Sequence, residues 1–367
     1  MKILQKYLLN EFLKYFAATI ISLIFFYITI DFISNIGAFT KHSPEFQYII
    51  IYFLYKLPEI IYRVLPLSIL LSTLLSISAL NKNNEITAVK SSGLSMLKFF
   101  APLIMLGLVI SVASFLLSNF IAVRTNVLRR VVMQRDINKN KSFNEKSVYK
   151  YTTKNILIHY KRCIVTAEIM DPSRKTIKGV NVYVFNDKFV LLKRYIAKSG
   201  RFGNKGLILS AGQVDRFIMK NKSDGGLEQE YFKAVKLPVY LNLNFFRSNA
   251  LRPEFLSIIN LSKMVAVAKK SESGLSYVLT SYYSKLSFPL INLILILVGI
   301  SIGLMLGKKG NSPVSIGISI VFAFTWWVIN SIALSLGESA QLSPFLAAFM
   351  ADIIFMSFAV YLIAGID

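Results

Sequence analysis

Residues 286–306 include the stretch FPLINLILILVGISIGLML, at 288–306, which carries no charged residue. A helix needs about 20 mostly apolar residues to cross the hydrocarbon of a bilayer, so this stretch predicts a membrane helix. Five further apolar stretches lie at residues 12–36, 60–80, 97–121, 314–336 and 343–364. The sequence therefore predicts six membrane helices, three before and three after a more polar middle region.

The composition agrees with a membrane protein. Of the 367 residues, 54% are hydrophobic and 17% are charged, and the net charge is +23. Soluble domains carry about 25% charged residues, and disordered chains are less hydrophobic, so both classes are disfavoured. The basic residues gather in the middle, where 31 of the 42 Lys and Arg fall between Arg124 and Lys285 against 11 acidic residues.

The middle region changes from long apolar runs to short alternating ones. Five segments approach a period of two residues: NILIHY, GVNVYVF, FVLLKRYIAKSG, GLILSAGQVDRFIM and KLPVYLNL. Such a series, separated by turn signals, predicts a sandwich or barrel-like β domain at about 126–257. Residues 1–125 then hold the first three helices, and 258–367 hold an amphipathic connector and the last three. No phosphate-binding loop or dinucleotide motif occurs.

Basic residues in the short loops orient the helices. The side read as cytoplasmic carries eight of them: Lys2, Lys6, Lys14, Lys82, Lys90, Lys98, Lys308 and Lys309. The opposite short loops are expected to hold three: Lys41, Lys56 and Arg63. This asymmetry predicts that both termini are cytoplasmic and that the β domain lies on the other side of the membrane, in the periplasm.

Other residue types limit the chemistry and predict the packing. Cys163 is the one cysteine and His42 and His159 are the two histidines, so a zinc site is not expected. Neither a metal nor a cofactor is predicted for this chain. Gly299, Gly303 and Gly307 repeat a GxxxG spacing, which predicts close contact between two helices.

The loop NKNNEITAVKSSGLS, residues 81–95, is the first candidate for function. Its centre predicts a short helix that starts near Asn84 and is ended by Gly93, because glycine commonly adopts the left-handed helix cap. A short surface helix with one carboxylate, Glu85, suits docking of a soluble partner. The alternative is an ordinary solvated turn.

Charged residues near the membrane are the second candidate. An acidic side chain at membrane depth costs about 2.5–3.5 kcal/mol on insertion scales, so Asp31 and Asp352 point to function or pairing, although a place at the membrane interface is favoured for Asp31. The basic residues expected on the outer side suit binding of an anionic lipid headgroup. The alternative is that these charges only keep the domain soluble and contact ordinary phospholipids. These headgroup candidates are Lys41, Arg63, Arg124, Arg129 and Arg130.

Four segments together resemble one family. Residues 65–95, LPLSILLSTLLSISALNKNNEITAVKSSGLS, are similar to the second helix and coupling motif of the LptF/LptG (YjgP/YjgQ) permeases of lipopolysaccharide export. Residues 282–304, 315–337 and 342–355 are similar to the last three helices of that family. The order of these segments, with a β domain between helices three and four, makes the resemblance specific over essentially the whole chain.

The resemblance implies an α-helical integral membrane protein with six transmembrane helices and an inserted periplasmic β jelly-roll domain. It further implies an inner-membrane permease that extracts lipopolysaccharide, working with a second LptF/LptG-type permease, an LptB-type ATPase dimer that binds ATP and Mg, and an LptC-type subunit. Nucleic acid is not a partner. The loop near 82–92 becomes the coupling helix, with these contact candidates: Asn84, Glu85, Ile86, Ala88, Ser92 and Gly93.

Residues 30–39 and 179–202 resemble LptG more than LptF. Two departures stand out: lysines that this type can carry in the outer half of helix one are missing, and Val123 stands where the family has a proline after helix three. The headgroup contacts of the family therefore do not transfer residue by residue. The alternatives are a permease of another lipid- or lipoprotein-extracting ABC system, a secondary transporter of anionic solutes, and a membrane-anchored scaffold.

Overall fold

The computed structural model describes residues 2–140, 143–145, 153–160, 162–171, 176–186, 189–203, 206–219, 225–237, 256–271, 275–307 and 312–364. The chain folds as two compact units. We call the first the helical unit; it comprises Met1–Ser142, Phe255–Leu261 and Ser276–Asp367. We call the second the β unit; it comprises Phe143–Glu254 and Ser262–Leu275.

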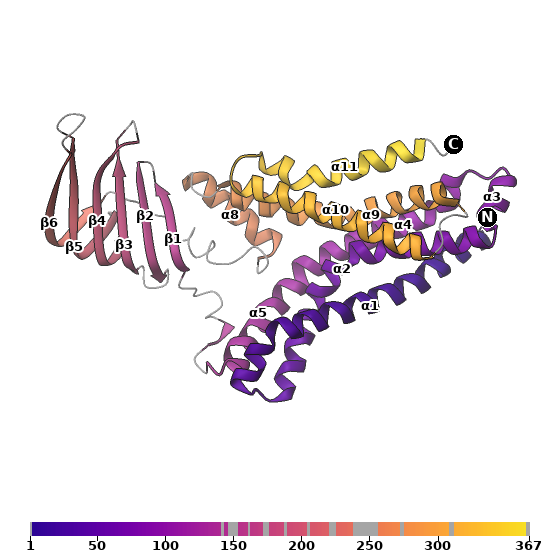
Figure 1. Ribbon diagram of the computed structural model, residues 1–367, viewed down its shortest axis with the longest axis horizontal. Helices are drawn as coiled ribbons and strands as arrows, with labels where there is room; N and C mark the ends of the chain where they lie inside the picture. The colour runs from indigo at the N-terminus through magenta and orange to yellow at the C-terminus, as the bar shows by residue number, and fades with distance from the viewer. Residues whose placement is uncertain are drawn as a thin grey trace. The chain divides into compact units, whose positions relative to one another are not determined.

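Six helical segments in the described part of the chain are long and apolar enough to span a membrane, which confirms that prediction. Five of them are single helices: α1 (Lys2–His42), α2 (Phe46–Lys82), α9 (Leu275–Leu306), α10 (Ser312–Glu338) and α11 (Pro344–Ala364). The remaining span joins four pieces end to end: α4 (Met96–Leu116), the π-helical turn η1 (Leu117–Ile121), α5 (Ala122–Val132) and the π-helical turn η2 (Met133–Ile137). Figure 1 shows α1, α2 and α5 side by side.

Three predicted boundaries need correction. The second helix begins at Phe46, so Lys56 and Arg63 lie inside α2 and not in a loop. The third span continues to Ile137, so Arg124, Arg129 and Arg130 lie on a helix, and the predicted start of the β domain at residue 126 is too early. Charged residues end an apolar pattern in sequence, but they do not end a helix when neighbouring helices supply ion-pair partners.

The core of the helical unit lies where α2 meets α9. Two glycines of the GxxxG series make this contact close: a Cβ atom on Gly299 would lie 2.8 Å from Thr73 Cγ2, and one on Gly303 would lie 2.7 Å from Ile77 Cγ2. The Asn81 side-chain amide donates a 3.1 Å hydrogen bond to the Gly303 carbonyl. Small residues therefore bring the two helices together, as the spacing predicted.

The connector before α9 is a separate helix, α8 (Ile258–Ser271), and Ala268 on it belongs to the core of the β unit. The residues just before it are tied to the helical unit. The Lys285 ammonium donates to the Leu256 carbonyl, and the Ile258 amide donates to Asn119 Oδ1 at 3.0 Å. The predicted amphipathic connector is thus helical at Ile258–Ser271, and residues 272–274, before α9, lie outside the described residues.

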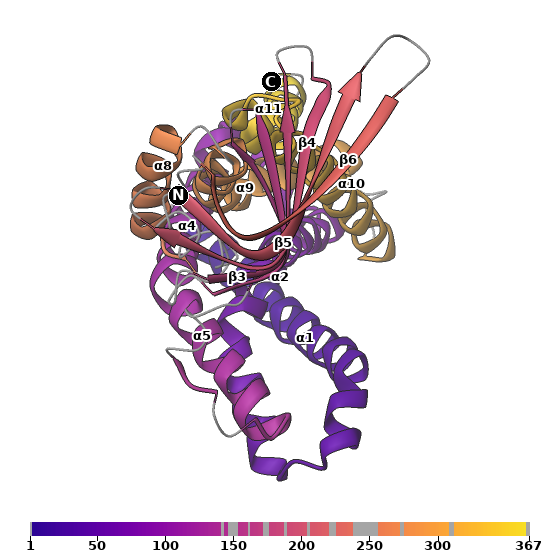
Figure 2. The ribbon, with the colours of Figure 1, turned by 90° about the vertical axis from the view of Figure 1, so that its left-hand side faces the viewer.

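The β unit contains six antiparallel strands that pair in chain order. They are β1 (Thr153–Tyr160), β2 (Cys163–Asp171), β3 (Thr176–Phe185), β4 (Leu191–Gly203), β5 (Gly206–Met219) and β6 (Gly225–Leu237). The strands lie next to one another and twist across the sheet (Figure 2). The inserted antiparallel β domain is therefore confirmed.

Two details of that domain differ from the prediction. Among the described strands each pairs with the next in chain order, which is the order of a meander and not the crossover order of a jelly roll. The sequence patterns missed β2 and β6, the latter because its segment LEQEYFKAVK is rich in charge. The predicted strand KLPVYLNL lies mostly outside the described residues.

One face of the sheet forms the core of the β unit. Val165, Val182 and Leu209 are fully buried there. Gly179 has a φ of +59°, and Ile177 and Val180 on either side of it are both buried. The positive φ of Gly179 coincides with a break in the strict alternation of buried side chains along β3, while the pairing register is unchanged on both sides of it.

Candidate functional site

The loop between α2 and α4 folds as the predicted short helix, α3 (Glu85–Ser91). Asn84 precedes it in the left-handed conformation with a φ of 59°, and Gly93 follows it with a φ of +73°. Ile86 and Val89 are buried in the same apolar cluster as Leu8. One face of α3 is thus anchored to the membrane helices, while the opposite face is open.

The candidate contact residues of α3 therefore divide into two groups. Ile86 points into the core and holds the helix in place, so it is not available to a soluble partner. Asn84, Ala88, Ser92 and Gly93 are exposed, and Glu85 is half-buried. A partner that docks on α3 meets these residues and not Ile86.

Glu85 connects α3 to the beginning of α1. Its Oε1 atom accepts one 3.2 Å hydrogen bond from the Tyr7 hydroxyl and another from the Asn83 side-chain amide at 3.2 Å. Tyr7 was not predicted as a site residue, because it lies 78 residues away in sequence and the pairing depends on the fold. The consequence is a direct link between α3 and α1.

A second site, which we call the charged cluster, lies at the other end of α1 and α2. It contains Asp31 on α1, Lys56, Glu59 and Arg63 on α2, and Arg129 on α5. Positions 56, 59 and 63 follow a spacing of three and four residues, which puts their side chains on one face of α2. That spacing is the sequence signal by which the cluster could have been found.

Lys56 is the most enclosed cation of the cluster. Its ammonium pairs with Asp31 Oδ1, and the side chains of the two residues are 8% and 14% exposed. The ammonium also lies 5.9 Å from the ring centroid of Tyr27 and 5.7 Å from that of Tyr52, within the range of a cation–π contact. Asp31 is therefore one half of a buried ion pair.

Glu59 joins the two arginines of the cluster. Arg63 NH2 lies 2.7 Å from Glu59 Oε1, and Arg129 NH2 lies 3.6 Å from Glu59 Oε2. Two of the five headgroup candidates thus already have a carboxylate partner. Lys41 and Arg124 are exposed, and so is Arg63, whose side chain is 49% exposed despite its ion pair. Arg130 is half-buried on α5.

Asp352 also has a partner. It lies on α11, is 5% exposed, and its Oδ1 atom accepts a 3.2 Å hydrogen bond from Trp326 Nε1 on α10. Its second oxygen, Oδ2, has no hydrogen-bond partner among the described residues. The pair joins two neighbouring membrane helices inside an apolar cluster that includes Phe355.

Metal and thiol chemistry find little support in the part of the chain that the structure describes. No group of three His, Cys, Asp or Glu side chains there is arranged to hold a metal ion. Cys163 is half-buried in the β unit, and burial raises the pKa of its thiol, so the reactive thiolate is disfavoured at neutral pH.

Comparison with known proteins identifies the family. The family model described as "Lipopolysaccharide export system permease LptF/LptG" matches residues 6–364, which is nearly the whole chain. A search of curated proteins found no match. The matched region includes the six membrane spans, the α3 loop and the inserted β unit, in the order that the resemblance required. The chain therefore belongs to the LptF/LptG family of lipopolysaccharide export permeases, transmembrane subunits whose ATPase is a separate protein.

Proposed function

We propose that this chain is the LptG-type permease of an inner-membrane complex that also contains an LptF-type permease, an LptB-type ATPase dimer and an LptC-type subunit. The LptG assignment rests on residues 30–39 and 179–202 of the sequence. The observation that carries the role in an ATPase-driven complex is the placement of Glu85, which lies on a short helix anchored by Ile86 and Val89 and is hydrogen-bonded to Tyr7 of α1. Membership in the family already disfavours a secondary transporter or a scaffold.

The proposed orientation puts both termini and α3 in the cytoplasm and the β unit in the periplasm. It rests on the eight basic residues that flank the helices on the α3 side. ATP and Mg bind to the partner ATPase, and this chain supplies the surface on which the ATPase acts. The β unit passes lipopolysaccharide from the membrane toward the LptC-type subunit.

The coupling step follows from the contacts of α3. Closure of the ATPase dimer moves α3, and the Tyr7–Glu85 hydrogen bond transmits this movement to α1. The membrane cavity formed with the second permease then changes between two states of different affinity for the lipid. That difference in affinity does the work of extraction, as linkage requires.

The lipid phosphates are proposed to contact exposed cations at the outer helix ends, first Lys41 and Arg124. Arg63, Arg129 and Arg130 are proposed as weaker phosphate contacts. At these residues a phosphate has to compete with existing partners such as Glu59. Charge-assisted hydrogen bonds from arginine suit phosphate oxygens. Apolar side chains along the helices then face the acyl chains.

The Glu85→Lys variant tests the coupling step. Reversing a charge at the centre of an interface typically costs about 2–5 kcal/mol, so ATPase co-purification is expected to fall more than about thirtyfold, with loss of lipopolysaccharide export. Tyr7→Phe is expected to keep the ATPase bound and to lower export. The control is Glu45→Lys, an equal reversal at the far end of α2. Full ATPase binding by Glu85→Lys contradicts the proposal.

Photo-crosslinking of lipopolysaccharide in membranes tests the headgroup contacts. Each lost cation weakens attraction to an anionic lipid by about 1 kcal/mol, so Lys41→Glu with Arg124→Glu is expected to lower crosslinking by at least about tenfold. Lys98→Glu, an exposed lysine at the start of α4, serves as the control. Undiminished crosslinking in the double variant would mean that these cations serve only solubility.

A further inference from the structure

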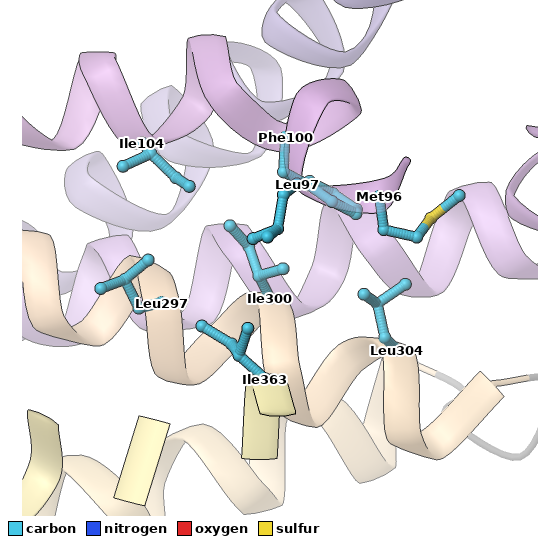
Figure 3. Close-up of a pocket in the computed structure, with 8 residues that line it drawn as sticks. All are labelled: Met96, Leu97, Phe100, Ile104, Leu297, Ile300, Leu304 and Ile363. Carbon is cyan, nitrogen blue, oxygen red and sulfur yellow. The ribbon is translucent and has the colours of Figure 1, made fainter. Parts of the chain in front are cut away.

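An apolar slot lies in the helical unit between α4, α9 and α11. Figure 3 shows eight side chains around it, all of them apolar. Met96, Phe100 and Ile104 contribute from α4 at a spacing of four residues, so they form one ridge of that helix. Ile300 and Leu304 contribute from α9. The slot is narrow, with a cavity volume of about 20 Å³.

A larger and more polar hollow adjoins the slot. Leu304 lines both spaces, and the last turn of α11 lines both as well, through Ile363 in the slot and Tyr361 in the hollow. The hollow has a volume of about 650 Å³, and its one charged lining residue among those described is Lys90 of α3. The slot and the hollow thus share a wall, and among the described residues the hollow has one cation, Lys90.

We propose that the hollow binds the headgroup of an anionic phospholipid, with the phosphate beside Lys90 and an acyl chain lying over the apolar slot. An apolar slot alone cannot select one lipid from the others in the bilayer. An acyl chain gains little free energy when it moves from contact with other acyl chains to contact with leucine and isoleucine side chains. Selection therefore comes from the charge of Lys90 and the exposed hydroxyl-bearing side chain of Tyr361. Anionic headgroups are attracted by lysine near the membrane surface.

A lipid fits the surroundings of the slot better than a protein segment does. The rim residue Leu97 is 48% exposed, and Met105 on the same helix is 70% exposed. Apolar surface thus continues from the slot along α4, as expected of a face that meets acyl chains. The leaflet occupied by this lipid is the cytoplasmic one, a point that rests on the proposed orientation.

The ligand would touch α3, α9 and α11 at once, through Lys90, Leu304 and Tyr361. These contacts connect the helix proposed to receive the ATPase to the ends of two membrane helices. An anionic phospholipid is therefore a structural ligand of the coupling region, distinct from the lipopolysaccharide that the complex transports.

The test uses the purified permease complex in nanodiscs of phosphatidylcholine, without nucleotide. A photoreactive acyl chain is carried by either phosphatidylglycerol or phosphatidylcholine, and labelled peptides are identified by mass spectrometry. We expect phosphatidylglycerol to label the slot residues about fivefold more than phosphatidylcholine does, an advantage that matches one lysine near an anionic headgroup. The labelling ratio depends neither on ATP hydrolysis nor on docking of the ATPase. Its outcome is therefore independent of whether the coupling proposal is correct.

Two variants with matched controls locate the site. Lys90→Gln is expected to remove the fivefold preference, whereas Lys98→Gln, which loses the same charge outside the hollow, is expected to keep it. Leu97→Trp is expected to lower labelling by both lipids because it fills the slot rim, whereas Met105→Trp on the same helix is expected to leave labelling unchanged. Equal labelling by the two lipids, or slot peptides crosslinked to another protein subunit instead of lipid, would overturn the proposal.

Discussion

The helices α1 and α2 are consecutive in the chain and nearly equal in mean hydropathy, at 2.1 and 1.9, yet they differ greatly in burial. In the most apolar window of each helix, 6% of the α1 residues and 72% of the α2 residues are buried. The α2 helix carries small polar residues such as Ser68, Ser72 and Ser76, all fully buried, whereas α1 exposes Phe25 and Phe26. Small polar residues therefore mark a helix that faces protein, and large apolar residues mark one that faces lipid or a partner.

The largest expected effect concerns the one place where α1 depends on a buried charge of α2. Lys56→Met leaves Asp31 buried without its cation, and breaking a buried ion pair in this way costs about 3–5 kcal/mol. We expect a clear fall in the thermal-unfolding midpoint of the detergent-solubilised protein. Lys41→Met, an exposed lysine on α1, is the control and is expected to change little.

A double variant makes that prediction more specific. Asp31→Asn combined with Lys56→Met removes both charges and is expected to recover much of the lost stability, because the penalty comes from the unpaired carboxylate. If Lys56→Met alone is as stable as the original chain, or if the double variant is less stable than the single one, the ion pair does not hold α1 to α2.

The next effect concerns the close contact of α2 with α9. Gly303→Val puts a branched side chain where a Cβ atom already lies 2.7 Å from Ile77, and overpacking of this kind costs about 1–3 kcal/mol. The same thermal assay is expected to show a lower midpoint. Gly317→Val on α10 is the matched control, since no atom lies within 4 Å of its Cβ position. Equal midpoints for the two variants would contradict the close contact.

The smallest effect is expected on the exposed face of α1. Phe25 is 69% exposed, so Phe25→Ala is expected to change the stability of the isolated chain by less than about 0.5 kcal/mol. Phe12, on the same helix but fully buried, provides the contrast, since Phe12→Ala is expected to cost about 3–5 kcal/mol. A large loss of stability for Phe25→Ala would contradict this expectation, because it would mean that Phe25 packs against other residues of the chain.

Much of the fold follows from local signals in the sequence. Apolar length predicts the six spans, and Gly93 with the polar residues before it predicts α3. The alternating segments predict an inserted β domain, although β2 and β6 lack a strong enough pattern to be recognised. These successes share one cause: each signal lies within the element that it predicts.

The charged cluster could not be predicted in the same way. Lys56, Glu59 and Arg63 interrupt the apolar pattern of α2, and they are accommodated only because Asp31 and Arg129 approach from two other helices. The Tyr7–Glu85 link has the same character, since its partners are 78 residues apart in sequence. The spacing of positions 56, 59 and 63 marks one charged face of α2, but the partners on other helices have no local signature in the sequence.

The length of α1 gives the Tyr7–Glu85 hydrogen bond a mechanical meaning. Tyr7 and Asp31 sit toward opposite ends of one uninterrupted helix of 41 residues, about 36 Å apart along its axis at 1.5 Å per residue. If α1 tilts about 5° about its Tyr7 end, Asp31 moves by about 3 Å. The helix then acts as a lever arm: a small rotation where α3 is attached becomes, at the far side of the bilayer, a displacement large enough to separate Asp31 from Lys56.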